Sequence, residues 1–99
     1  MKKIRTIIVD DEPLAIEGLN LRLDVHGDID VIATCPNGRQ ALAAIKQHKP
    51  DLVLLDIQMP GLDGFAVVRS LIGSYMPLVV FVTAFDEYAL AAFESHALD

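Results

Sequence analysis

Three apolar runs along the chain share one feature: each ends on a small side chain that carries oxygen. The runs and the residues that follow them are Ile4–Val9 before Asp10 and Asp11, Leu52–Leu55 before Asp56, and residues 78–82 before Thr83. Near-continuous apolar runs of this length are typical of strands buried on both faces of a parallel sheet. Because parallel strands end along one edge of their sheet, the pattern predicts a crevice that contains three carboxylates and a hydroxyl.

The segments between these runs predict helices and one further strand. Leucine and isoleucine recur at helical spacing over 14–23, and residues 30–35 have the composition of a second strand. Asn37, with Gln40 three residues later, resembles a capping box before an apolar helical face at 41–45. Asp63 is a plausible N-cap for a helix over 64–72, and a last helix should begin near Asp86. Alternating strands and helices predict right-handed βαβ units in one α/β domain.

Composition narrows the function without identifying it. A chain of 99 residues that is 53% apolar predicts one domain with a packed core. Its formal net charge of −6 argues against binding of this domain itself to the phosphate backbone of a nucleic acid. The sequence has neither an apolar stretch of membrane-spanning length nor a signal-peptide pattern, so we expect a cytoplasmic protein without membrane association. The single cysteine, Cys35, is expected at the edge of the core.

Three segments together carry a resemblance to a known family. Residues 9–13 (Val-Asp-Asp-Glu-Pro), 55–64 (from Leu55 through Met59-Pro60-Gly61 to Gly64) and 82–84 (Val-Thr-Ala) resemble the signature segments of response-regulator receiver domains, the CheY-like fold. Residues 83–93 are similar to the branch whose receivers precede LytTR-type (AlgR-type) DNA-binding domains. The resemblance covers the whole chain, and it implies a flavodoxin-like doubly wound parallel sheet with strand order 2-1-3-4.

The resemblance also implies a role for each residue at the strand ends. A sensor histidine kinase would phosphorylate Asp56, and the domain would catalyse only its own phosphoryl transfer and dephosphorylation rather than act as a conventional enzyme. Asp10 and Asp11, together with Asp56 and the backbone carbonyl of Gln58, would hold Mg²⁺. The hydroxyl of Thr83 would bond the new phosphoryl oxygen. The physical reason for the metal is that clustered carboxylates repel one another, so they favour a hard divalent cation that takes oxygen ligands.

Each of these residues alone also has an ordinary structural interpretation. Asp56 could close a turn, Asp10 and Asp11 could cap a helix, and Thr83 could be a plain strand residue. Their shared placement at the strand ends favours the site. For Phe85 two hypotheses stay open: it either influences the access of water to the acyl phosphate, as the family suggests, or it packs in the core.

The chain stops at Asp99, before the fifth strand, the lysine and the fifth helix that receivers of this family carry. We therefore expect residues 1–99 to be a receiver domain that is incomplete at its C-terminal side, with any DNA-binding output domain elsewhere in the protein. The apolar strand at 78–82 would then form an exposed edge, which predicts a homodimer through this strand or through exchanged elements.

Two other classes of function compete with the phosphoacceptor domain. One is an interaction or dimerisation module that works without phosphorylation, which the absence of the lysine favours. The other is a haloacid-dehalogenase-like phosphohydrolase, which also forms an aspartyl phosphate. That family places its nucleophile in an Asp-x-Asp motif after the first strand, and residues 10–13 read Asp-Asp-Glu-Pro here, so the match is poor.

Overall fold

The computed structural model describes residues 2–82, in which strands and helices alternate along the chain. The strands are β1 (Ile4–Val9), β2 (Ile29–Cys35), β3 (Leu52–Leu55) and β4 (Leu78–Phe81), and the helices are α1 (Pro13–Leu23), α2 (Gly38–His48) and α3 (Gly64–Leu71). All strand pairs are parallel, and the order across the sheet is β2-β1-β3-β4. The predicted α/β class and strand order are both confirmed.

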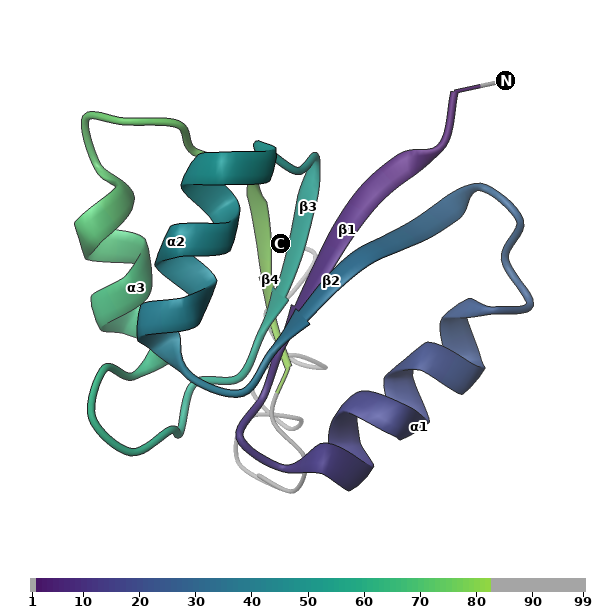
Figure 1. The fold of residues 1–99 in the computed structure, drawn as a ribbon, viewed down its shortest axis with the longest axis horizontal. Coiled ribbons are helices and arrows are strands. Elements are labelled where there is room, and N and C mark those ends of the chain that lie inside the picture. Colours follow the sequence, from purple (N-terminus) through teal and green to yellow (C-terminus); the bar gives the residue numbers. More distant parts are fainter. Residues whose placement is uncertain (1, 83–99) are drawn as a thin grey trace, which may run out of the picture.

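The sheet lies between two layers of helices. Figure 1 shows α2 and α3 side by side on one face of the sheet and α1 on the other. The main core lies between the sheet and the α2–α3 layer, and its fully buried members are Ile7, Val9, Ala41, Ile45, Val53, Leu55, Val67 and Leu71. On β1 the side chains of Thr6 and Ile8 are also fully buried, so this central strand is buried on both faces as predicted.

Local hydrogen bonds explain where two of the helices begin. The Asn37 side chain accepts a hydrogen bond from the Gln40 backbone N–H at 2.9 Å, which caps α2. The Asp63 side chain accepts one from the Ala66 backbone N–H at 2.8 Å, which caps α3. Both predicted N-caps are confirmed, and each satisfies a backbone donor that the first turn of a helix would otherwise leave unpaired.

The pairing of β1 with β2 contains an irregularity. Thr6 lies opposite Val31, but the next residue, Ile7, lies opposite Ala33, so β2 has one extra residue at Ile32. A bulge of this kind shifts every later residue of the strand by one position relative to its partner. As a result Cys35, and not its predecessor Thr34, lies opposite Val9, and its side chain is buried as predicted.

The fourth strand is much more exposed than the first. Leu78, Val80 and Phe81 are 68%, 42% and 39% exposed, and the described strand ends at Phe81 rather than at residue 82. Within residues 2–82, β4 pairs only with β3, so the expectation of an exposed apolar strand agrees with this part of the chain. The predicted last helix, Thr83 and Phe85 lie outside the described residues. No helix among the described residues is long and apolar enough to cross a bilayer.

Candidate functional site

Three of the predicted site residues meet at the C-terminal edge of the sheet. Asp10 and Asp11 directly follow β1, and Asp56 directly follows β3, the strand beside it. One carboxylate oxygen from each of the three residues lies within 4.8 Å of the others. The parallel sheet thus brings together side chains that are 45 and 46 positions apart (11 and 10 against 56), as the pattern of strand ends predicts.

Backbone hydrogen bonds continue from the strands to the first acidic residue after each one. The Asp10 N–H donates to the carbonyl of Cys35 at 3.0 Å, and the Asp56 N–H donates to the carbonyl of Val9 at 2.9 Å. These bonds extend the sheet ladder by one residue at each strand end. The two aspartates are therefore positioned by the sheet itself and not by a loose loop.

Each of the two aspartates also folds the chain that follows it. The Asp10 side chain accepts a hydrogen bond from the Glu12 N–H at 2.9 Å, and the Asp56 side chain accepts one from the Gln58 N–H at 3.2 Å. This bond between a carboxylate and the backbone two residues later is an Asx turn. It turns the chain away from the strand and leaves one oxygen of each carboxylate without a described protein donor.

Burial and like charge act together on Asp56. Its side chain is 8% exposed and that of Asp10 is 4% exposed. Burial, and after it the charge of Asp10, raise the pKa of Asp56 to about 6. The Gln58 N–H opposes them with a smaller effect, and the charge of Asp11 raises the pKa by less still. A carboxylate held this way is poorly compensated by the protein alone, so a cation beside it would lower the free energy of its ionised form. The donor set, oxygen atoms only, suits a hard divalent ion.

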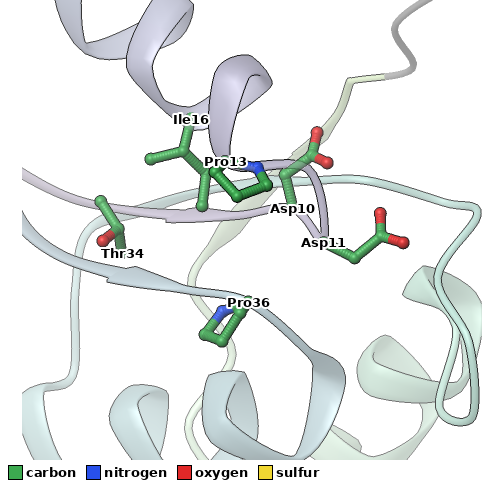
Figure 2. A pocket seen from close by; sticks show the side chains of 6 residues that line it. All are labelled: Asp10, Asp11, Pro13, Ile16, Thr34 and Pro36. Atoms are coloured by element: carbon green, nitrogen blue, oxygen red, sulfur yellow. The ribbon is translucent and has the colours of Figure 1, made fainter.

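An open hollow adjoins the acidic pair. It has a volume of about 340 Å³ and is lined by Asp10, Asp11, Pro13, Ile16, Thr34 and Pro36. Figure 2 shows Pro13 and Ile16 on the α1 side, Thr34 and Pro36 on the β2 side, and the two carboxylates toward one end. The wall formed by Pro13 and Ile16 is therefore apolar, and the end at Asp10 and Asp11 is anionic.

The hollow adds residues that the sequence pattern did not single out. Thr34 and Pro36 lie at the end of β2. This strand is not followed by an acidic residue, so the pattern of acidic strand ends did not point to them. The strand order would have revealed them, because β2 is the neighbour of β1 on the side away from β3. Of the other predicted site residues, Gln58 has an exposed side chain and lies in the loop after Asp56, and Thr83 lies outside the described residues.

Comparison with known proteins identifies a family. The sequence profile described as "Response regulator receiver domain" matches residues 6–99. The transcriptional regulatory protein BtsR of Escherichia coli K12 is 46% identical over 96 residues, which cover 97% of this chain and 40% of BtsR. An uncharacterised response regulatory protein of Vibrio cholerae is 50% identical over 95 residues, which cover 94% of this chain and 36% of that protein.

A solved structure supports the same relationship at the level of the fold. The signal receiver domain of NarL from Mycobacterium tuberculosis superposes with a TM-score of 0.80 at 37% identity, over 91% of this chain and 73% of that one. The chain spans about 40% of the length of the BtsR proteins it matches, so the similarity to them concerns one part of those regulators.

Proposed function

This chain belongs to the response-regulator receiver domains of two-component systems, and on that premise we propose that Asp56 is its phosphoryl acceptor. The observation that carries the proposal is the convergence of three carboxylates within 4.8 Å at the edge of the sheet. Burial and the negative charges of its two neighbours raise the pKa of Asp56 to about 6. Perturbed carboxylates of this kind are concentrated at functional sites.

The proposed reaction is a phosphoryl transfer from a phosphohistidine of a sensor kinase. An oxygen of the ionised Asp56 forms a bond to phosphorus while the bond between phosphorus and the imidazole nitrogen breaks, and the imidazole leaves with its electron pair and takes up a proton. The product is an acyl phosphate, whose reactivity suits a signal that must be reset. Phosphorylation replaces one negative charge with nearly two and adds acceptor oxygens, for which the hydroxyl of Thr83 is the proposed partner.

We propose that Asp10, Asp11 and Asp56, with the backbone carbonyl of Gln58, hold Mg²⁺. Oxygen donors and a surplus of negative charge fit this ion. When bound, it offsets the charge of the carboxylates and of the transferred phosphoryl group. Asp10 is held by its bonds to Cys35 and Glu12, so it can present the same oxygen before and after the transfer.

The test of the acceptor is a labelling experiment on the full-length protein. Asp56→Asn should abolish labelling by acetyl phosphate in the presence of Mg²⁺, because the amide is not a nucleophile. Asp28→Asn, which removes an exposed aspartate from the turn before β2, is the matched control and should label normally. Undiminished labelling of Asp56→Asn, with the phosphate mapped to another residue, would overturn the assignment.

Relatives that are transcriptional regulators suggest what the phosphorylated domain controls. We propose that it regulates a DNA-binding part of the same protein outside residues 1–99, of the LytTR type that residues 83–93 resemble, because the relatives are about two and a half times as long as the matched region. The site of action would be the cytoplasm, where ATP renews the phosphohistidine of the kinase. Loss of regulated transcription in an Asp56→Asn strain, with the protein still present, would support this link.

One observation favours a second candidate function, self-association through β4. Leu78 and Val80 are apolar and are 68% and 42% exposed within the described part of the chain, and exposed edge strands readily pair with other strands. A homodimer formed in this way could work without phosphorylation. Light scattering of the Val80→Lys variant beside the wild type tests the idea: only the wild type should dimerise, and equal masses would contradict the β4 interface.

A further inference from the structure

We propose that Gly64, assisted by Gly38, is a positioning residue for the acceptor site, an inference that rests on the proposed function of Asp56. The two glycines begin α3 and α2, and both are buried. Between them runs the segment 57–63, which follows the acceptor and contains Gln58. The absence of a side chain at both helix starts lets this acceptor segment lie against the backbone of the two helices.

Gly64 approaches the acceptor residue itself. A Cβ added at Gly64 would lie 2.5 Å from the carbonyl oxygen of Asp56 and 3.0 Å from the Cα of Ile57. Both are backbone atoms, so no side-chain rotation could relieve the contact. The Gly64 N–H also donates to the carbonyl of Ile57 at 3.0 Å, which closes the acceptor segment into a compact loop. Any residue larger than glycine must displace the backbone of Asp56.

Gly38 holds the far end of the same segment. A Cβ at this position would lie 2.5 Å from the carbonyl oxygen of Leu62 and 3.0 Å from a methyl group of Val67. In the middle of the segment, Met59 is 7% exposed and belongs to the core. The acceptor segment is therefore fixed near its start, in its middle and near its end.

The need at these two positions is for space and not for an unusual backbone conformation. Among the described glycines only Gly61 and Gly73 have positive φ angles, at 76° and 86°. At a helical position with ordinary φ, alanine normally favours the helix over glycine. The two glycines therefore lower the helix propensity at the start of α2 and α3. In return they allow the backbone of both helices to lie close to the acceptor segment.

The consequence concerns the placement of two proposed oxygen donors. The Asp56 side chain is attached to the backbone that Gly64 contacts, and the Gln58 carbonyl lies two residues further on. Displacement of reacting groups by about 1 Å can lower a rate on the order of 100-fold. Gly64→Ala should therefore lower both the affinity for Mg²⁺ and the labelling rate at saturating Mg²⁺, the latter on the order of 100-fold.

The experiment compares Gly64→Ala, Gly38→Ala and Gly18→Ala in the full-length protein. Gly18 lies in α1 with no heavy atom within 4 Å of an added Cβ, so Gly18→Ala controls for the change of glycine to alanine. Calorimetric titration with Mg²⁺ and acetyl phosphate labelling are the functional readouts. Thermal melting in EDTA shows whether each variant is folded. A purely structural role would lower the melting temperature and leave the Mg²⁺ affinity of the folded protein unchanged.

The outcomes separate this inference from the function on which it rests. If the wild type neither binds Mg²⁺ nor labels, the proposed function fails. If the wild type and folded Gly64→Ala bind Mg²⁺ and label equally, only the positioning role is overturned. Should Gly64→Ala not fold, Gly38→Ala decides, because its added Cβ meets the carbonyl oxygen of Leu62 at the other end of the same segment. Reduced Mg²⁺ affinity in folded Gly38→Ala supports the proposal, and wild-type affinity overturns it.

Discussion

The two faces of the sheet are packed very differently. On one face, α2 buries Gly38, Ala41 and Ile45, and α3 buries Gly64, Val67 and Leu71. On the other face, α1 buries no residue in the part of the chain that the structure describes, and its Leu14 and Leu21 are 79% and 68% exposed. The same sheet therefore has a close-packed layer and a lightly attached one.

The candidate site lies at the edge of the sheet that separates these two layers. The acceptor segment after Asp56 is fixed to the close-packed layer through Met59, Gly38 and Gly64. The acidic pair precedes α1, the lightly attached helix. We infer that the acceptor is the rigid part of the site, whereas the metal-binding pair depends on its own Asx turn and strand-end bonds for its position. The following predictions test this difference.

The largest expected contrast is in the free energy of unfolding. Leu71→Ala, which truncates a fully buried residue of α3, should lower it by about 2–5 kcal/mol because a cavity forms. Leu21→Ala in α1 removes an exposed side chain and should change it by about 0.5 kcal/mol or less. Urea denaturation followed by circular dichroism measures both. Equal losses would show that α1 is packed as firmly as α3.

Binding of Mg²⁺ to both the acidic pair and Asp56 should stabilise the folded protein. At a concentration 100 times its dissociation constant, the ion should raise the free energy of unfolding of the wild type by about 2.7 kcal/mol. Asp11→Asn removes one proposed ligand from the α1 side and should lose most of this gain. Thermal melting with and without Mg²⁺ gives the comparison. A gain of the same size in Asp11→Asn would show that Asp11 is not a ligand.

The pH dependence of stability tests the electrostatics of Asp56 in metal-free protein. Because its pKa in the folded state, about 6, exceeds the ordinary value of 3.8, protonation favours the folded state. This contribution is fully present below about pH 4 and is lost as the pH rises through 6. Asp56→Asn should therefore exceed the wild type in stability at pH 7 by on the order of 1–2 kcal/mol, after a discount for solvent screening.

The control for this prediction is the same pair of proteins at low pH. Below the ordinary pKa of 3.8 the carboxyl group of Asp56 is mostly neutral in both the folded and the unfolded state, so the advantage of Asp56→Asn should largely disappear. Urea titrations in EDTA at pH 3.5 and pH 7 measure the difference. An advantage that does not depend on pH would point to packing rather than charge as its source.

The smallest expected contrast concerns the helix starts. Asp63→Ala removes the side-chain cap of α3 and should cost about 1 kcal/mol. Glu12, at the N-cap position of α1, makes no side-chain cap bond, so Glu12→Ala should cost about 0.5 kcal/mol or less. Chemical denaturation of both variants without Mg²⁺ checks the order, and a larger loss for Glu12→Ala would contradict it.

Particular residues show how far sequence reasoning reached. The parallel sheet and the meeting of Asp10, Asp11 and Asp56 follow from local signals, because apolar strands and acidic strand ends are read directly from the chain. The order of the strands was implied by the resemblance to receiver domains and not by these signals. The caps at Asn37 and Asp63 are equally local. The hollow beside α1 and the glycine contacts were not predicted. They depend on which backbones come close in space, and a glycine in a sequence does not reveal what lies next to it.

The extra residue of β2 at Ile32 has a consequence for insertions and deletions. Removing Ile32 would restore a regular ladder with Cys35 still opposite Val9, whereas removing a residue after it, such as Thr34, would bring Pro36 opposite Val9 in place of Cys35. The carbonyl that now accepts from the Asp10 N–H would then belong to a different residue, and the Pro36 wall of the hollow would be displaced. The length of this strand after Ile32 is thus coupled to the acidic turn beside it, and a redesign that shortens that part of the strand would have to rebuild the turn as well.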